Sequence, residues 1–349
     1  MPPQQKAVSG PAIIDIASTE LTEEDVSLIR HPATAGIILF SRNIHSLTQT
    51  KVLCQQLRAV REDLLICIDQ EGGRVQRLTE GVTRIPPMAA IGRVFQQSPQ
   101  QGLCDARAIG WLMARELKEV GVDLSLAPVL DLDTNICPAI GNRSFGLEPN
   151  QVSALSQAFV EGMKDAGMGS VGKHFPGHGK VSLDSHFDLP RDMRSLEELW
   201  QDDLLPFRAL TASSDTSLSG VMPAHIVFEA IDDKPVGFSE IWLKTVLRQK
   251  LGFDGLIFSD DLSMAAAEQA GAYPARVNAA LKAGCDLVLV CNNREAAREV
   301  LNALTVTMTT QQYQKKLQLI EHARPMTISD QQKQQEVRER LLSSDYREY

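Results

Sequence analysis

The chain has 349 residues and a formal net charge of −9, and 43% of its residues are hydrophobic and 23% charged. This composition provides for a large buried core and an ordinary polar surface. The length is compatible with a single α/β barrel. The acidic balance argues against broad binding to a nucleic acid backbone, which requires a basic surface. We therefore expect no nucleic acid partner.

Residues 1–10 are polar and include prolines, without the apolar stretch of a secretory signal. No later apolar run reaches the length of a membrane-spanning helix. The cysteines are scattered without a Cys-x-x-Cys pair, and a chain of this size needs no disulfide framework. We therefore expect a cytoplasmic protein in a reducing compartment, with no membrane partner.

Short apolar runs recur along the chain, and segments with helical character separate them. Near-continuous apolarity is typical of parallel strands that are covered on both faces. The runs predict eight strands, at residues 12–16, 36–40, 64–69, 122–127, 170–174, 219–223, 255–260 and 286–290.

The intervening segments carry helix boundary signals. The stretch from Thr22 to Asp25 has the capping-box pattern, and His31 and Pro32 end that helix. The carboxyl-terminal stretch, rich in glutamine and charge, predicts a solvated helix with a fraying tip. Further helices are predicted at residues 105–120, 150–166, 239–250 and 273–282, each followed closely by a glycine.

Eight strand–helix alternations predict an α/β fold, a single (β/α)8 TIM-type barrel. We expect one catalytic domain over residues 1–349, with residues 1–10 and about 329–349 as polar terminal segments, acting as a monomer. A doubly wound open sheet is less favoured. It would need a glycine-rich turn after the first strand, where residues 16–19 read Ile-Ala-Ser-Thr.

Polar side chains follow the predicted strands. In a barrel the carboxyl ends of all strands meet at one rim, where active sites lie. The sequence therefore predicts an active site at this rim. One member, His225, either lines that site or satisfies a buried backbone carbonyl. The polar residues at the strand ends include Asp15, Arg42, Asp69, Asp131, Lys173, His174, His225, Asp260 and Asn292.

The stretch 172–186 combines glycines, a proline and histidines, which indicates a special backbone beside functional side chains. A zinc site would use His174, His178, Asp184 and His186, but their spacing matches no common ligand pattern and Lys173 would lie beside the cation. Alternatively, Lys173 forms a Schiff base, or it donates hydrogen bonds to an oxygen-rich ligand. We expect no metal and no cofactor, and the alternatives stay open.

Five stretches together resemble glycoside hydrolase family 3, and in particular its single-domain bacterial β-N-acetylglucosaminidases. The resemblance runs from about residue 10 to residue 293, in order and at sensible spacing, and its motifs are specific. The stretches are residues 69–77 (DQEGGRVQR), 141–146 (GNRSFG), 173–179 (KHFPGHG), 184–186 (DSH) and 258–264 (FSDDLSM).

The resemblance implies a role for each matching residue. Asp260 matches the catalytic nucleophile of the family, and His186 matches the general acid/base, with Asp184 as its partner. The neighbouring Asp261 is interpreted as a buried hydrogen-bond acceptor or helix cap. The positions that match the binding site for a terminal N-acetylglucosamine are Asp69, Arg77, Arg143, Lys173 and His174.

The implied activity is a retaining exo-β-N-acetylglucosaminidase that forms a covalent glycosyl-aspartate. The implied substrate is N-acetylglucosamine linked β-1,4 to 1,6-anhydro-N-acetylmuramic acid, often with a peptide, in peptidoglycan recycling. A histidine with a pKa of about 6.5 can give a proton to the leaving oxygen and later take one from water. We also expect the glycine-rich loop to move as substrate enters. A substrate-assisted N-acetylhexosaminidase, in which the acetamido group attacks, remains an alternative.

Overall fold

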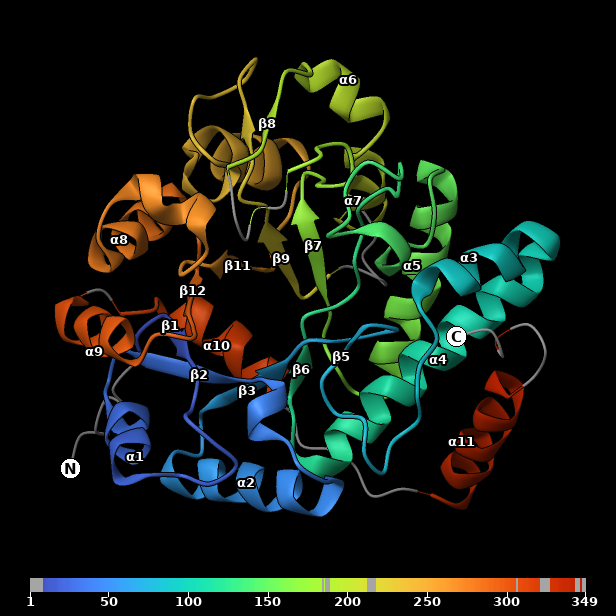
Figure 1. Cartoon of the computed structure of the whole chain (residues 1–349), viewed down its shortest axis with the longest axis horizontal. Coiled ribbons are helices and arrows are strands. Elements are labelled where there is room, and N and C mark those ends of the chain that lie inside the picture. Colours follow the sequence, from blue (N-terminus) through green and yellow to red (C-terminus); the bar gives the residue numbers. More distant parts are fainter. Residues whose placement is uncertain are drawn as a thin grey trace.

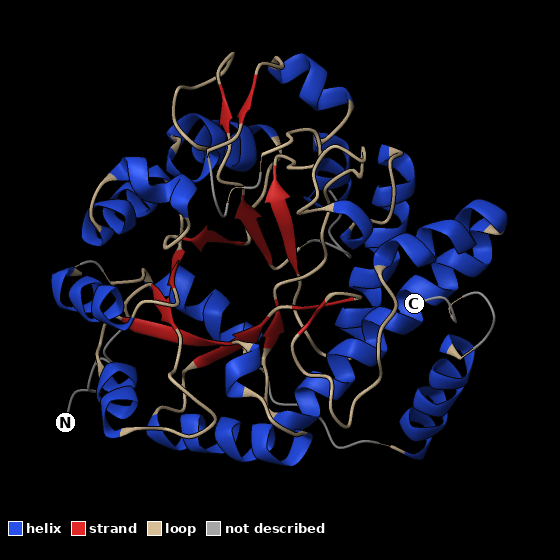
Figure 2. Cartoon of the chain, viewed as in Figure 1, coloured by secondary structure: helices blue, strands red, loops and turns tan. Residues whose placement is uncertain are grey.

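The computed structural model describes residues 9–183, 185, 189–211, 218–305, 307–320, 327–342 and 346. At its centre lies one sheet of parallel strands with the order β6-β3-β2-β1-β12-β11-β9-β7. Helices surround these strands (Figures 1 and 2). The strands are β1 (Ala12–Ile14), β2 (Thr34–Leu39), β3 (Leu65–Ile68), β6 (Leu124–Ser125), β7 (Val171–Phe175), β9 (Gly220–Pro223), β11 (Leu256–Asp261) and β12 (Leu287–Val290).

The segment that follows β6 joins the two ends of this sheet. The backbone N–H of Val171 donates to the carbonyl of Ala127 at 2.8 Å, and the N–H of Leu130 donates to the carbonyl of Lys173 at 2.6 Å. These bonds connect β6 to β7 and close the barrel. Each predicted strand run overlaps one strand of the sheet, so the predicted (β/α)8 barrel is confirmed.

Most of the predicted outer helices begin and end near the predicted boundaries, but α4 begins at Pro99, before the predicted start at residue 105. Thr22 and Asp25 form the predicted capping box, with 2.9 Å and 3.1 Å bonds, and Gly121 ends α4 with a φ of 91°. The segment predicted helical at residues 239–250 contains a π-helix. The outer helices are α1 (Glu23–Arg30), α2 (Leu47–Val60), α3 (Met88–Gln97), α4 (Pro99–Val120), α5 (Pro149–Asp165), α6 (Leu196–Gln201), α7 (Leu204–Thr211), η4 (Ile241–Lys250), α8 (Tyr273–Ala283) and α9 (Arg294–Ala303).

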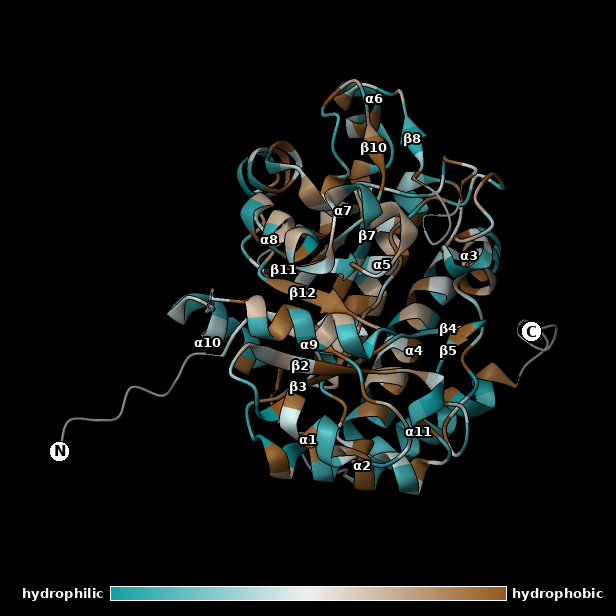
Figure 3. Ribbon diagram, turned by 60° about the vertical axis from the view of Figure 1, so that its left-hand side comes forward, coloured by the Kyte–Doolittle hydropathy of each residue, from teal (hydrophilic) through white to brown (hydrophobic). Residues whose placement is uncertain are grey.

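The apolar side chains form two buried clusters, one inside the barrel and one between the sheet and the helices. Ile13 belongs to the inner cluster, whereas its neighbours Ala12 and Ile14 belong to the outer one. This alternation follows from the strand period of two and explains why the strands lack polar positions along most of their length. Figure 3 shows the strands β11 and β12 as hydrophobic and the outer helices as mixed.

The carboxyl-terminal helices cover the amino end and one side of the barrel. From α10 (Thr310–Leu319), the buried Lys316 donates to the backbone carbonyl of Asp63 at 2.9 Å, and Leu319 joins the inner cluster. The predicted terminal helix is α11 (Ile328–Leu341). It is not solvated on all sides, because Val337 is buried and Arg340 pairs with Asp105 of α4 at 2.8 Å.

Short elements complete the carboxyl rim. The strands β4 (Gln70–Gly72) and β5 (Val75–Gln76) form an antiparallel hairpin after β3, and β8 (Arg191–Asp192) pairs with β10 (Val227–Phe228). The short 3-10 helices are η1 (Ser41–Asn43), η2 (Gly141–Arg143), η3 (Val236–Phe238) and η5 (Ala265–Ala270). In the described part of the chain, every helix is too short or too polar to span a membrane.

The contact between α4 and α5 generates a stability prediction. A Cβ atom at Gly110 of α4 would lie 2.2 Å from the carbonyl oxygen of Phe159 in α5. We expect Gly110→Ala to lower the free energy of unfolding by about 1–3 kcal/mol through overpacking, although alanine is the better helix former. Denaturant unfolding measures this change. Gly237→Ala is the control, because the nearest atom to its Cβ would be 3.7 Å away. A Gly110→Ala variant as stable as wild type would contradict the close packing.

Candidate active site

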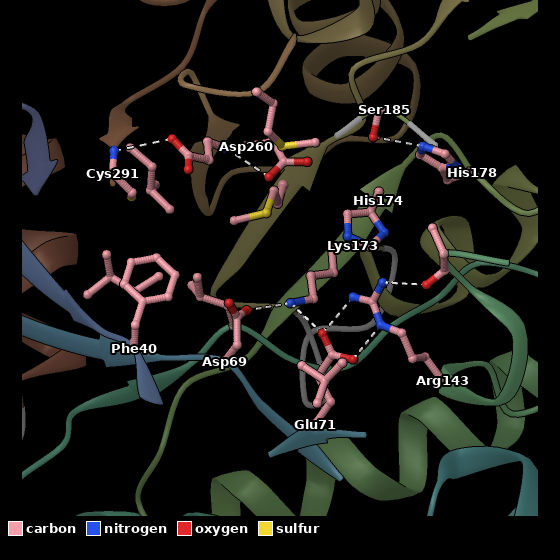
Figure 4. A pocket seen from close by; sticks show the side chains of 18 of the residues that line it. Phe40, Asp69, Glu71, Arg143, Lys173, His174, His178, Ser185, Asp260 and Cys291 are labelled. Atoms are coloured by element: carbon pink, nitrogen blue, oxygen red, sulfur yellow. Dashed lines mark hydrogen bonds and ion pairs between the residues drawn. The ribbon is translucent and has the colours of Figure 1, made fainter. Parts of the chain in front are cut away.

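A cavity of about 410 Å³ opens at the carboxyl ends of the barrel strands (Figure 4). Its polar side chains come from the ends of β3, β7 and β11 and from the adjoining loops. The described residues to which the family resemblance assigned a catalytic or binding role all line this cavity, whereas Asp184 and His186 lie outside the described residues. The polar lining consists of Asp69, Glu71, Arg74, Arg77, Arg143, Lys173, His174, His178, Ser185, Asp260, Asp261 and Asn292.

One wall of the cavity is an ion cluster of alternating charge. The Nζ atom of Lys173 lies 2.8 Å from Oδ1 of Asp69 and 2.6 Å from Oε1 of Glu71 (Figure 4). Arg143 binds both carboxylate oxygens of Glu71 at 2.8 Å, and Arg77 lies 3.7 Å from Asp69. Lys173 and Glu71 are almost fully buried. Polar hydrogens and carboxylate oxygens therefore face the cavity at fixed positions.

The ion cluster keeps its members charged. Burial by itself raises the pKa of Glu71, but the charges of Arg143 and Lys173 hold it well below its usual value. Burial by itself lowers the pKa of Lys173, but Asp69 and Glu71 raise it above its usual value. A protonated ammonium lacks the lone pair that Schiff-base formation requires. The arrangement therefore favours Lys173 as a hydrogen-bond donor over the Schiff-base alternative.

A buried carboxylate holds the His174 ring beside this cluster. The Nδ1 atom of His174 lies 2.6 Å from Oδ2 of Asp131, and the backbone N–H of His174 donates to Oδ1 of Asp131 at 3.2 Å. Burial by itself raises the pKa of Asp131, but His174 lowers it below its usual value. An ionised carboxylate accepts the Nδ1 proton, which makes Nε2 the nitrogen available to a ligand.

The strand β11 ends in two carboxylates with different surroundings. Asp261 accepts hydrogen bonds from the backbone N–H of Ser263 at 2.9 Å, from the Ser263 hydroxyl at 2.7 Å and from the backbone N–H of Cys291 at 3.2 Å. Burial, with a contribution from Asp260, raises the pKa of Asp261 to about 6. These contacts agree with the interpretation of Asp261 as a hydrogen-bond acceptor, but the residue is partly exposed and lines the cavity instead of lying fully buried. In Figure 4, Asp260 and Glu71 lie on different walls of the cavity.

The structure settles the interpretation of His225. The Nε2 atom of the buried His225 donates to the backbone carbonyl of Asp261 at 3.2 Å. This is the second of the two interpretations of His225, and His225 is not part of the cavity lining. The zinc alternative stays a hypothesis, because Asp184 and His186 lie outside the described residues. Within the described residues, no three His, Cys, Asp or Glu side chains are placed to hold a metal.

Sequence reasoning missed the role of Glu71 and of Asp131 in this site. Glu71 lies two residues after Asp69, a spacing that places side chains on one face of an extended strand and could have indicated their common target. Asp131 follows the fourth predicted strand, but no local pattern links it to His174 across 43 residues. Closure of the barrel, and not the local sequence, determines which residues Glu71 and Asp131 contact.

The glycine-rich stretch after β7 serves close packing in at least one place. A Cβ atom at Gly179 would lie 1.7 Å from the backbone carbonyl oxygen of Leu132. The carbonyl of Gly179 also accepts a hydrogen bond from the Thr134 hydroxyl at 2.6 Å. This close backbone contact therefore requires glycine at position 179. Movement of the loop, which was expected from its glycines, stays a prediction.

Comparison with known proteins identifies the family of this chain. Residues 8–320 match the glycosyl hydrolase family 3 N terminal domain. The chain belongs to glycoside hydrolase family 3. The family resemblance that the motifs indicated is therefore confirmed, and this protein is an enzyme.

Curated relatives of this family 3 hydrolase extend over most of its length. A β-hexosaminidase of Methylococcus capsulatus is 51% identical over 292 residues, which is 84% of this chain and 86% of the relative. A β-hexosaminidase of Pseudomonas aeruginosa is 48% identical over 297 residues, which is 85% of this chain and 87% of the relative. Among solved structures, NagZ from Neisseria gonorrhoeae in complex with N-trifluoroacetyl-D-glucosamine is 42% identical, with a TM-score of 0.88, and the match covers 95% and 98% of the two chains.

The ion cluster of the family 3 hydrolase predicts a large effect of Glu71→Gln. Removing the shared carboxylate leaves two cations without their counter-ion, so we expect unfolding to become easier by about 3–5 kcal/mol at pH 7. Glu80→Gln is the control, since Glu80 is exposed.

The pH dependence of the same variant checks the cause. The folded-state pKa of Glu71 is lowered, so its contribution to stability is present above the ordinary pKa of about 4.3 and is lost as the pH falls further. The difference between wild type and Glu71→Gln should therefore shrink below that pH in chemical unfolding. A difference that is constant from pH 7 to pH 3 would rule out the charge as its origin.

Proposed function

We propose that this family 3 hydrolase is a retaining exo-β-N-acetylglucosaminidase that uses Asp260 as its nucleophile. The observation that carries the proposal is the placement of Asp260 in one cavity with the Asp69–Lys173–Glu71–Arg143 ion cluster. The cavity thus combines a carboxylate at a strand end with a buried wall of donors and acceptors. Curated β-hexosaminidases among the relatives and the ligand of the gonococcal NagZ support an amino sugar as substrate.

The ion cluster is suited to hold the terminal sugar. Lys173 and Arg143 present several N–H donors to hydroxyl and acetamido oxygens, and the Asp69 carboxylate can accept from two hydroxyls. His174 adds one ring nitrogen. A volume of about 410 Å³ lies within the range of small-ligand sites.

The proposed reaction has two displacement steps. A carboxylate oxygen of Asp260 attacks the anomeric carbon, and the bond from that carbon to the leaving oxygen breaks as the protonated His186 gives its proton to that oxygen. In the second step neutral His186 takes a proton from water. The water oxygen then attacks the anomeric carbon and the bond to Asp260 breaks. The roles of His186 and of its partner Asp184 are supported by the family resemblance.

The finer part of the proposal concerns the natural substrate and its setting. We propose that the enzyme removes N-acetylglucosamine from 1,6-anhydro-N-acetylmuramic acid or its peptide, in cytoplasmic peptidoglycan recycling, as a monomer. The likeness to single-domain bacterial β-N-acetylglucosaminidases supports this assignment. Among the described residues no two cysteines form a disulfide, and most of the cysteines are buried, which agrees with a reducing compartment.

Substitution of the proposed nucleophile is the main test. We expect Asp260→Ala to lower kcat on the order of 10⁴-fold or more, the scale that follows removal of a catalytic nucleophile. Azide should restore turnover by attacking the anomeric carbon from the vacated face, with the α-glycosyl azide as product. Kinetics and NMR of the product measure both effects. Asp254→Ala, at a side chain that is 83% exposed, is the control. An Asp260→Ala variant with native activity would refute the proposal.

A trapping experiment separates the covalent route from substrate assistance. We expect 5-fluoro-N-acetylglucosaminyl fluoride to leave a sugar adduct on the peptide that contains Asp260, because the fluorine slows breakdown of the glycosyl-aspartate. Mass spectrometry of the digested protein locates the adduct. Strong inhibition by an N-acetylglucosamine thiazoline together with no adduct would instead support attack by the acetamido group.

A further inference from the structure

Arg74 differs from the other arginine and lysine side chains of the active-site cavity because its charge is not paired with a carboxylate. The others each form an ion pair with a carboxylate of the ion cluster, and they are Arg77, Arg143 and Lys173. Arg74 also lines the cavity and is partly exposed. Within the described part of the chain, it bonds to uncharged acceptors alone. Its positive charge is therefore not neutralised by a described side chain.

The uncharged acceptors hold the guanidinium of Arg74 in place. Its Nη2 atom donates to the backbone carbonyls of Pro138, Ala139 and Ile140 at 2.9, 2.7 and 3.1 Å. Its Nε atom lies 3.4 Å from Oδ1 of Asn142. Among the residues that the structure describes, no acceptor is bonded to Nη1. The guanidinium thus keeps two N–H donors and its charge for a ligand.

The backbone that carries Arg74 is also fixed. Arg74 follows Gly72 and Gly73 in the turn between β4 and β5, and the two glycines have φ angles of 113° and 56°. The N–H of Gly73 donates to the carbonyl of Ile85 at 2.8 Å, and a Cβ atom at Gly73 would lie 2.8 Å from Cβ of Pro87. Arg74 is therefore anchored at both ends, so that it loses little conformational freedom when it binds a ligand.

Arg74 lies next to the sugar-binding wall, on its more exposed side. The carbonyl of Ala139 accepts from Arg74 at 2.7 Å and from Nη1 of Arg143 at 2.9 Å, so the two guanidinium groups are neighbours. The side chain of Arg143 is 11% exposed, and Glu71 neutralises it (Figure 4). Because Arg74 has no such counter-ion, an anionic group of a ligand would be attracted to this side of the cavity.

We infer that Arg74 binds a carboxylate on the leaving portion of the substrate and is a specificity-determining residue of this enzyme. In the proposed function, on which this inference rests, the terminal sugar occupies the buried ion cluster. The leaving portion then extends toward the exposed side of the wall, where Arg74 lies. A guanidinium matches a carboxylate in both charge and geometry. The muramic acid of the proposed natural substrate carries such a carboxylate on its lactyl group when no peptide is attached.

The test uses pairs of substrates that differ in charge but hardly in size. One pair is 3-carboxyphenyl and 3-carbamoylphenyl β-N-acetylglucosaminide, and the other is N-acetylglucosaminyl-1,6-anhydro-N-acetylmuramic acid and its lactyl amide. For each pair, we expect Arg74→Met to lower the ratio of kcat/KM for the acid to kcat/KM for the amide by about tenfold relative to wild type. Comparison with wild type cancels any difference in reactivity within a pair. Arg74→Lys keeps the charge and should retain most of the preference.

A matched control removes the same charge elsewhere. Arg84 is exposed and is not part of the cavity lining, so Arg84→Met should leave the ratio unchanged. In wild type the ratio should fall as ionic strength rises, because salt screens an exposed charge. This second measurement does not depend on the folding of a variant. A wild-type ratio that is independent of salt would overturn the inference.

The outcomes separate this inference from the proposed function. If Arg74→Met lowers kcat/KM equally for the acid and the amide, or changes neither, Arg74 does no more than anchor residues 138–142 and the inference is overturned. Asp260→Ala in the same assays then decides the proposed function independently. Loss of turnover on every substrate supports the proposed function even if Arg74 shows no selectivity. Native activity of Asp260→Ala contradicts the proposed function, and the inference falls with it.

Discussion

The carboxylate that Lys173 and Arg143 share at Glu71 is the constraint on which the site depends. Burying ions is costly, and it is tolerated only when each charge meets a well-placed partner. Here the partners come from the hairpin after β3, the end of β7 and the loop that follows β6. The cluster forms only when the barrel brings these three segments together. The ion cluster therefore becomes ordered only as the barrel itself folds.

The parallel barrel explains why the ion cluster and Asp260 lie on different walls of the cavity. All strands end at one rim, so residues far apart in sequence reach one cavity from different directions. The ion cluster holds several donors and acceptors in fixed positions, which suits orientation of a sugar. Asp260 enters from β11, and Asp131 supports both His174 and His178. In the proposed reaction, sugar binding, attack and proton transfer therefore use different side chains.

The sequence predicts the framework of this protein better than its internal contacts. Strands that are buried on both faces appear in the sequence as short runs of apolar residues. The eight predicted runs therefore coincide with the eight strands of the sheet. Local caps such as Thr22 with Asp25 were readable for the same reason, because both partners lie within one turn. The polar strand ends and the family motifs predicted that the site residues lie at one rim of the barrel. The pairing of Glu71 with Arg143 spans 72 residues and depends on closure of the barrel, so no local pattern contains it. The terminal helix looked solvated because its ion pair with Asp105 is invisible in its own sequence.

The most direct test of the account is a crystal structure of the enzyme with N-acetylglucosamine. The account predicts that the sugar hydroxyls contact Asp69, Lys173 and Arg143, and that the anomeric carbon lies about 3–3.5 Å from a carboxylate oxygen of Asp260. A sugar bound outside this cavity, or one with its anomeric carbon turned away from Asp260, would contradict it.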